Sequence, residues 1–297
     1  MSLRRRHFLE EGADTPYERA RVVVLPAPFE GTVSYGSGTA SGPQAILDAS
    51  EQLELYDEEL GFEPFRCGVW TAPALALDAR SPEDAVSAVE SRVGELLADG
   101  KWVVTLGGEH SITAGAVRAA ASRYPGLRVV QIDAHADLRE TYQGQRYSHA
   151  CAMTRCLEVA PVHALGIRSY SREEAARIRD GRGRYRLLHA WEMESEDWTE
   201  RALDGLRGHP VYLTIDVDGF DPAIVPATGT PEPGGLAWRP VLGYLGELFG
   251  AAQVVSADVV ELAPIPGLRH PDFTVARLVY KLIGFAARRL TRSEAVP

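Results

Sequence analysis

Residues 127–137 read LRVVQIDAHAD, and this stretch decides the fold class and points to the chemistry. Its first six residues are mostly apolar or β-branched, a pattern typical of a buried strand. If the chain stays extended beyond Ile132, the side chains of Asp133, His135 and Asp137 lie on one face, because side chains alternate along a strand. Two carboxylates and an imidazole could then meet at one point. A solvated acidic turn would have the same local sequence, so the rest of the chain has to decide.

Five further apolar runs have the character of short buried strands. They lie at residues 22–25, 102–106, 162–166, 211–215 and 253–256. Helical stretches separate them, and the clearest, residues 81–97, opens with Ser-Pro-Glu-Asp, which supplies a cap, a first-turn proline and early acids. Short apolar strands that alternate with helices predict an α/β fold in three layers, α/β/α, with a mostly parallel central sheet.

The domain organisation is simple. No linker rich in Pro, Gly or Ser divides the chain, so we expect one catalytic domain over residues 21–297. The polar residues 1–20 are expected to form an N-terminal arm on the surface. The arm holds three consecutive arginines but lacks the apolar segment of a signal peptide, and no later run approaches the length of a membrane span. We therefore expect neither secretion nor a membrane partner.

Composition narrows the function classes. The chain has 297 residues, 45% of them hydrophobic, which is enough to bury a substantial core. With 31 basic and 41 acidic residues its formal charge is −10, which argues against non-specific nucleic-acid binding and favours cationic small molecules. The three cysteines form no Cys-x-x-Cys pair, so neither a disulfide framework nor a thiolate zinc site is indicated. A reducing cytoplasm fits this cysteine usage best.

Side chains of the types that bind metal ions follow three of the predicted strands. They are His110 after 102–106, Asp133, His135 and Asp137 after 127–132, and Asp216 and Asp218 after 211–215. The carboxyl ends of parallel strands share one edge of a sheet, and ligands bind beyond that edge. Four carboxylates packed together without a cation would repel one another at considerable cost, whereas two divalent ions would neutralise them. The oxygen-rich, thiol-free set predicts a binuclear centre, with Mn²⁺ before Zn²⁺ and with Co²⁺ and Ni²⁺ also compatible.

Three motifs in this order resemble those of the ureohydrolase family, the arginases and agmatinases. They are GGEHS at 107–111, DAHAD at 133–137 and TIDVDGFDP at 214–222. The resemblance runs from about residue 22 to residue 285 and takes in PATGTP at 226–231 and SADVVE at 256–261. The family's commoner form of the first motif has Asp in place of Glu109; because the ligand is His110, we expect this exchange to leave metal binding intact. The resemblance implies an arginase-like fold, a hydrolase acting on linear amidines, and a homo-oligomer, either trimer or hexamer.

The same resemblance implies a role for each site residue. One manganese ion would be bound by His110, Asp133, Asp137 and Asp216, and the other by Asp133, His135, Asp216 and Asp218. His149, in the loop YSHA, would shuttle protons near the mouth of the site, and Glu261 would pair with the substrate guanidinium by a charge-assisted hydrogen bond. Asp137 is expected to pass a proton to the leaving amine.

The substrate is predicted from the loop that follows the second motif. Residues 138–146, LRETYQGQR, lack the Asn- and Ser-rich character of arginases and are more similar to agmatinases. Glu140 could face a distant amine, while Arg139 or Arg146 could instead accept a carboxylate. We predict an agmatinase that uses two Mn²⁺ ions to convert agmatine, a small cationic guanidino substrate, to putrescine and urea in polyamine synthesis. Aminopropylagmatine, guanidinobutyrate, arginine and formiminoglutamate are alternative substrates within the family.

Two further readings remain open. A binuclear-metal phosphoesterase or deacylase also uses Asp and His ligands, but an anion-binding site favours Arg or Lys where this chain has Glu261. A non-catalytic relative would lack part of the ligand set, which here is complete.

Overall fold

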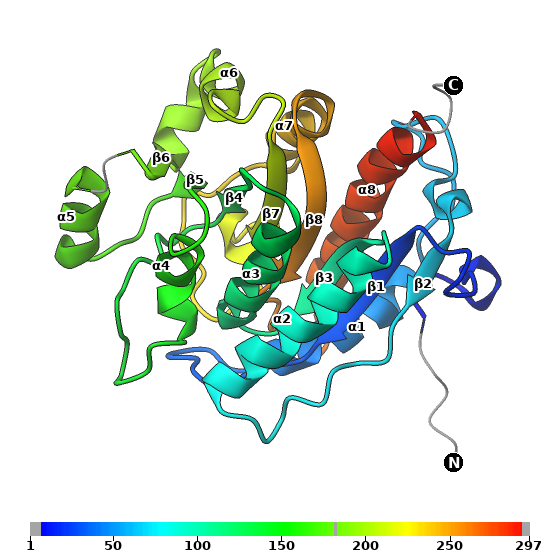
Figure 1. The fold of residues 1–297 in the computed structure, drawn as a ribbon, viewed down its shortest axis with the longest axis horizontal. Helices are drawn as coiled ribbons and strands as arrows, with labels where there is room; N and C mark the ends of the chain where they lie inside the picture. Colours follow the sequence, from blue (N-terminus) through cyan, green and yellow to red (C-terminus); the bar gives the residue numbers. More distant parts are fainter. Residues whose placement is uncertain (1–6, 181–182, 293–297) are drawn as a thin grey trace.

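Eight strands form one parallel sheet at the centre of the protein (Figure 1). The structure, a computed structural model, describes residues 7–180 and 183–292. The strands are β1 Val22–Ala27, β2 Val69–Thr71, β3 Trp102–Gly107, β4 Arg128–Ile132, β5 Val162–Ile167, β6 Tyr185–His189, β7 Pro210–Asp216 and β8 Gln253–Val260. Their order across the sheet is β2-β1-β3-β8-β7-β4-β5-β6, and every pairing is parallel. The predicted α/β class and parallel sheet are confirmed.

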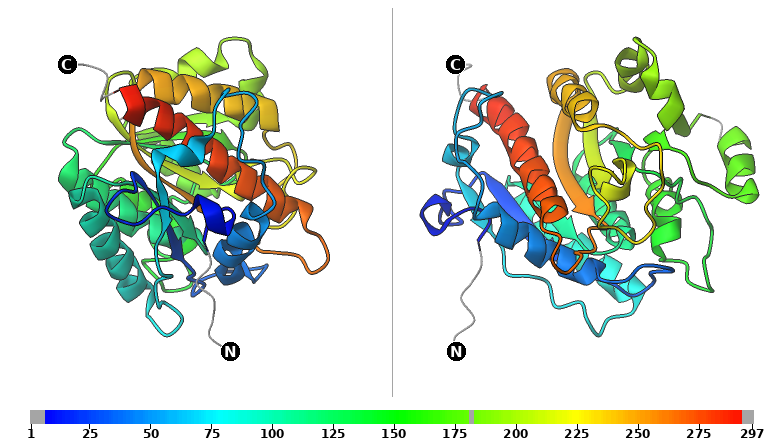
Figure 2. Two further views of the ribbon diagram at one scale, coloured as in Figure 1. Left: turned by 90° about the vertical axis from the view of Figure 1, so that its right-hand side faces the viewer. Right: turned by 180° about the vertical axis from the view of Figure 1, so that it is seen from behind.

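Helices cover both faces of this sheet. They are α1 Gly42–Ser50, α2 Pro82–Ala98, α3 Thr113–Arg123, α4 Ala152–Cys156, α5 Arg172–Asp180, α6 Trp198–Leu203, α7 Trp238–Ala251 and α8 His270–Arg292. Helix α2 starts as its sequence predicts, because the Ser81 hydroxyl accepts the Asp84 N–H and Pro82 occupies the first turn. Figure 1 shows α2, α3 and α4 on one side of the sheet, and the reverse view in Figure 2 shows α1, α7 and α8 on the other.

The core lies in two layers, one on each face of the sheet. Strand β1 contributes to both, since Val22 and Val24 belong to the layer that includes α1, α7 and α8, while Val23 and Leu25 belong to the layer that includes α2 and α3. All six residues of β1 are buried. This two-sided burial explains why the central strands read as continuous apolar runs and not as alternating ones.

The strand order puts four strand ends side by side. Strands β1 to β3 form one half of the sheet and β4 to β6 form the other. Strands β7 and β8, which come last in the sequence, lie between the two halves. As a result β3, β8, β7 and β4 are consecutive neighbours, and their carboxyl ends meet at the middle of one edge. Ligand sites in open α/β sheets form where the strand order reverses in this way.

The N-terminal segment differs from the expected surface arm. Residues 1–6 lie outside the described residues, but Phe8 and Leu9 are each 1% exposed and belong to the core. Their backbone N–H groups donate to the Thr71 and Ser50 hydroxyls, both at 2.8 Å. Because those hydroxyls satisfy the buried N–H groups, the two apolar side chains can be buried with them. The boundary at residue 20 stays a prediction.

No helix within residues 7–180 or 183–292 combines the length and the apolar character needed to cross a membrane.

Candidate active site

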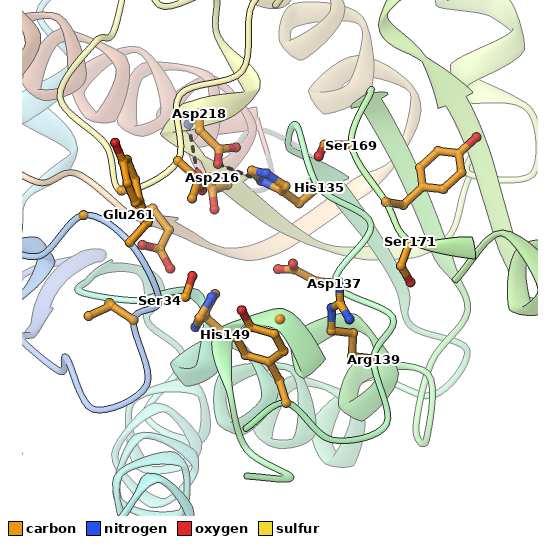
Figure 3. Close-up of a pocket in the computed structure, with 18 of the residues that line it drawn as sticks. Ser34, His135, Asp137, Arg139, His149, Ser169, Ser171, Asp216, Asp218 and Glu261 are labelled. Carbon is orange, nitrogen blue, oxygen red and sulfur yellow. Dashed lines mark hydrogen bonds and ion pairs between the residues drawn. The ribbon is translucent and has the colours of Figure 1, made fainter. Parts of the chain in front are cut away.

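The predicted site residues stand at the ends of the four central strands. His110 follows β3, Asp133 follows β4, Asp216 ends β7 and Glu261 follows β8. Beside these ends lies a cavity of about 320 Å³, and its lining includes His135, Asp137, His149, Asp216, Asp218 and Glu261, as Figure 3 shows. His110 and Asp133 are fully buried and do not line it. Residues up to 151 positions apart in the sequence are thus in contact at this edge of the sheet.

His110 is surrounded by carboxylates. Its Nδ1 atom lies 3.2 Å from Asp133 Oδ2, 3.0 Å from Asp137 Oδ2 and 3.4 Å from Asp216 Oδ2. The opposite ring nitrogen, Nε2, lies 2.9 Å from the Thr214 hydroxyl, which fixes the ring's orientation. Yet Nδ1 is buried and has no hydrogen bond of acceptable geometry among the described residues. An orphaned imidazole nitrogen facing three carboxylate oxygens fits a cation site.

A second cluster adjoins the first. His135 Nδ1 lies 2.9 Å from Asp218 Oδ2 and 3.7 Å from Asp133 Oδ1. Among the described residues, two groups have ligand atoms within 4.8 Å of one another: His110 with Asp133 and Asp216, and Asp133 with His135 and Asp218. Asp133 belongs to both, as a bridging ligand would. Asp216 falls in the first group alone by this distance, although its Oδ1 accepts the Asp218 N–H at 2.9 Å.

Burial and neighbouring charges strongly shift the pKa values of these groups. Burial raises the pKa of Asp133 to about 7, and the charges of Asp218 and Asp137 act in the same direction. Burial and the same kind of repulsion raise the pKa of Asp216 well above its usual value. Burial opposes protonation of His135, but the adjacent Asp218 and Asp133 raise its pKa to about 11. A site that draws in protons to balance its carboxylates is one that divalent cations would stabilise.

Two site residues adopt a strained backbone conformation. Asp137 has φ of 52° and Glu261 has φ of 66°, in the left-handed region that costs a non-glycine residue about 1–3 kcal/mol. Hydrogen bonds hold both turns, because the Asp137 carbonyl accepts the Met153 N–H at 3.1 Å and the Glu261 N–H donates to the Gly108 carbonyl at 2.8 Å. Such strain is typical of functional positions, where it aims a side chain.

Glu261 is placed to present one free carboxylate oxygen. Its Oε1 accepts the backbone N–H of His110 at 2.6 Å, and the side chain lines the cavity. Burial and the charge of Glu109 raise its pKa well above the usual value. A cation in the cavity would therefore be attracted to this carboxylate and would favour its ionised form.

In the predicted substrate loop, Glu140 is bound by residues outside the cavity. Glu140 accepts hydrogen bonds from Arg155 at 2.6 Å and Arg177 at 2.9 Å, and these two guanidinium groups lower its pKa to about 2. It does not line the cavity, so of the possible substrate partners in this loop Glu140 is not placed to face an amine there. Arg139 does line the cavity, with its guanidinium 5.1 Å from the centre of the Tyr142 ring. Arg146 instead pairs with Glu158 at 2.8 Å.

Supporting residues that the sequence did not single out orient the ligands. Gln131 donates to Asp133 Oδ2 at 2.8 Å and to the His135 carbonyl at 2.9 Å. The available signal was a fully buried amide inside the apolar strand β4, since such a group needs partners. Arg168, after β5, donates to the carbonyls of Asp218 at 2.7 Å and Glu232 at 2.8 Å and so ties two loops of the site together. Nothing in its local sequence indicates these distant acceptors.

The fold and the site together define a class of protein. A parallel α/β sheet that gathers two carboxylate–imidazole clusters and a buried glutamate at its carboxyl edge fits a metal-dependent hydrolase of a cationic substrate. The Arginase family model matches residues 20–284, and the chain belongs to this family.

Individual relatives agree with that assignment. The chain is 43% identical over 288 residues to N(1)-aminopropylagmatine ureohydrolase of Synechocystis sp., covering 94% of each chain. It is 35% identical over 252 residues to agmatinase of Halalkalibacterium halodurans, covering 84% of this chain and 86% of the other. The crystal structure of agmatine ureohydrolase of Thermoplasma volcanium superposes with a TM-score of 0.85 at 34% identity, covering 96% of each chain.

Proposed function

We propose that this protein hydrolyses N(1)-aminopropylagmatine to urea and the corresponding polyamine. The observation that carries this choice is the 43% identity to the Synechocystis enzyme of that name across 94% of both chains, against 35% for the agmatinase relative. Agmatine, which the loop 138–146 alone favoured, becomes the second candidate. The TM-score of 0.85 with an agmatine ureohydrolase supports agmatine as this second candidate.

The lining of the cavity supports a cationic, carboxylate-free substrate tail. Tyr35, Tyr142 and Tyr170 line it, and aromatic faces attract alkylammonium groups. Arg139 is the one arginine or lysine among the described lining residues, and its Nε lies 3.9 Å from Glu174 Oε2. Because Glu174 balances its charge, Arg139 is a weaker partner for the carboxylate of arginine or guanidinobutyrate.

The residues divide the chemistry as follows. His110, Asp133, His135, Asp137, Asp216 and Asp218 would hold two Mn²⁺ ions. When bound, such ions supply Lewis acidity and activate water at neutral pH. The Glu261 carboxylate binds the guanidinium and orients its central carbon. Water adds to that carbon as the Asp137 carboxylate takes one of its protons. The bond to the alkyl-substituted nitrogen then breaks as Asp137 returns that proton to the leaving amine. The second water proton is released as the carbonyl of urea forms, and it reaches the amine, as an ammonium, by exchange with solvent through His149.

A substrate panel tests the proposal. Urea release is measured with aminopropylagmatine, agmatine, arginine and guanidinobutyrate after addition of Mn²⁺, and we expect kcat/KM to be about tenfold higher for aminopropylagmatine than for agmatine. Glu261→Gln should lower every rate by about 100-fold or more, because a carboxamide cannot form the charged pair. The highest kcat/KM with arginine or guanidinobutyrate would contradict the choice. A phosphate monoester and an N-acetylated amine in the same panel test the phosphoesterase and deacylase readings.

The proposal includes the setting of the enzyme. Two Mn²⁺ per chain, a trimer or hexamer and a cytoplasmic role in polyamine synthesis follow from the family resemblance. Elemental analysis tests the first, with two equivalents expected. Light scattering of the purified protein tests the second.

A further inference from the structure

Glu109, the residue that departs from the commoner family motif, forms hydrogen bonds to the loop that follows β1. Its side chain is fully buried and accepts four hydrogen bonds. The donors are Gly31 N at 2.8 Å, Thr32 N at 2.6 Å, Thr32 Oγ1 at 2.7 Å and Ser111 Oγ at 2.6 Å. Two of these bonds end on each carboxylate oxygen, so both oxygens are occupied and Glu109 has no position left for a metal or substrate.

The backbone around Glu109 also contacts this loop closely. Glu109 N–H donates to the Phe29 carbonyl at 2.8 Å, and a Cβ at Gly108 would lie 2.0 Å from that carbonyl oxygen. The loop 29–32 therefore lies directly against the end of β3. Its Thr32 can move little without breaking several of these contacts.

Thr32 connects Glu109 to His149. The Thr32 hydroxyl oxygen accepts the backbone N–H of His149 at 3.0 Å and lies 3.2 Å from the ring Nδ1. A hydroxyl has one proton, and Thr32 gives its proton to Glu109. Its oxygen can then only accept from the ring, which requires the proton of neutral His149 to sit on Nδ1. The lone pair is left on Nε2, as in any neutral imidazole of that tautomer.

We propose that Glu109 is a positioning residue that acts through Thr32 to fix the ring and the tautomer of His149. His149 lines the cavity across from His135 and Asp218 (Figure 3), so a fixed Nε2 lone pair is a proton acceptor at a constant place in the site. This role rests on the proposed function, in which His149 moves protons. The glutamate matters because its extra methylene, about 1.5 Å longer than aspartate, sets the reach to Thr32.

A purely structural role for the hydrogen bonds of Glu109 would make different predictions. If Glu109 only anchors the loop, its loss should lower the unfolding temperature and metal content and should act independently of His149. Ser148 offers a second alternative, since its hydroxyl lies 3.4 Å from His149 Nδ1 and could donate to it, which would place the proton on Nε2.

Kinetics of Thr32→Val test the role with little change in shape. We expect kcat to fall by about 10- to 100-fold while KM changes less than about threefold, because the hydroxyl is lost and the branched side chain is kept. Thr32→Ser, which retains a hydroxyl, should recover most of the loss. Combining Thr32→Val with His149→Asn should lower kcat no further than His149→Asn alone. Glu109→Asp should resemble Thr32→Val in direction.

Ser111→Ala is the matched control, because Ser111 bonds the same carboxylate but does not contact His149. Its kcat should stay within about threefold of the wild type. Metal content and unfolding temperature are measured for each variant. Equal kcat for Thr32→Val and wild type, or independent and multiplicative effects of the two substitutions, would overturn the proposal.

Ring ¹⁵N resonances of His149 provide a readout that does not depend on turnover. In the Zn²⁺-loaded protein with labelled histidine, we expect a protonated Nδ1 in the wild type and a shift toward the other tautomer in Thr32→Val. A wild-type ring protonated on Nε2 would mean that the Ser148 hydroxyl donates to Nδ1, and it would refute the inference. If no substrate releases urea, the proposed function fails, whereas this measurement still decides the contact between Glu109, Thr32 and His149.

Discussion

Single residues show how the site is held for its task. Asp137 and Glu261 occupy left-handed backbone conformations that are uncommon for residues other than glycine. The buried Gln131 and Thr214 and the partly buried Arg168 supply hydrogen bonds that orient ligands and loops. Removing one of these supports should affect the site while leaving the ligands themselves in place.

Gln131→Leu is the first test at this scale. The substitution keeps the approximate volume of the side chain but removes the donor to Asp133 Oδ2. We expect Mn²⁺ affinity, measured by calorimetric titration, to fall by about 10- to 100-fold. Tyr185→Phe is the control, since the Tyr185 hydroxyl reaches Gln131 Oε1 at the longer distance of 3.3 Å and should matter less. Unchanged affinity in Gln131→Leu would show that Asp133 needs no such support.

His163 gives a prediction of pH dependence away from the site. It is buried in β5, and burial together with the charges of Arg186 and Arg128 lowers its pKa to about 4. Below the unfolded value of 6.5 the unfolded chain takes up a proton that the folded protein does not, so stability is lost as the pH falls from 6.5 to about 4. The loss should approach roughly 3 kcal/mol.

His163→Phe, which cannot bind a proton, isolates this contribution. Urea unfolding of wild type and variant is compared between the two pH values. The stability difference between them should shift in favour of the variant as the pH falls. A constant difference would mean that His163 titrates alike in both states.

Strands and loops differ in how much of their position is encoded locally. The six strands predicted from apolar runs are all present, because each is buried on both faces. The strands β2 and β6 at the two edges were not predicted. Strand β2 has three residues, and in β6 buried, intermediate and exposed positions follow one another without regular alternation, so neither strand has a strong periodic signal.

The contact between β3 and the loop after β1 predicts the effect of Gly108→Ala. The added Cβ would lie 2.0 Å from the Phe29 carbonyl oxygen, which belongs to the backbone and cannot turn away. We expect the free energy of unfolding to fall by about 1–3 kcal/mol and urea release to fall with it, since the loop carries Thr32.

Gly243→Ala serves as the comparison. Gly243 lies in α7 with nothing within 4 Å of the added Cβ. Its replacement should raise stability by about 0.5–1 kcal/mol. Denaturant unfolding of both variants decides the matter, and equal stabilities would argue against a close approach at Gly108.

For the whole molecule, we expect metal binding and folding to be coupled. Four buried carboxylates, those of Asp133, Asp137, Asp216 and Asp218, share the carboxyl edge of the sheet, and the pKa of Asp133 is raised to about 7. Saturating Mn²⁺ at about 100 times its Kd should add about 2.7 kcal/mol of stability and raise the Tm by roughly 4 °C. Because bound protons must leave, Mn²⁺ should bind more tightly at about pH 8 than at about pH 6.

Asp216→Asn separates the two effects of the carboxylates. The variant loses one buried charge, so its metal-free form should be more stable than the metal-free wild type while its response to Mn²⁺ is smaller. Thermal unfolding in chelator and in Mn²⁺ measures both quantities. A lower Tm for the variant in chelator would mean that Asp216 stabilises the fold through its neighbours and not through a cation.

The sequence by itself determined the fold class, the central strands and the set of residues that could bind metal. These features are local: a buried strand has a recognisable composition, and the every-second-residue spacing of Asp133, His135 and Asp137 follows from the extended backbone. The carboxyl edge could also be anticipated, since parallel strands all end on the same side.

Only the tertiary structure decided which of these residues work together. The insertion of β7 and β8 between β3 and β4 brings Glu261 to His110, and contacts spanning 77 and 117 residues join Thr32 to Glu109 and His149. It also turned Glu140 toward Arg155 and buried Phe8 and Leu9 in the core. Such contacts depend on the strand order and on side chains far away in the chain, and no local pattern encodes either.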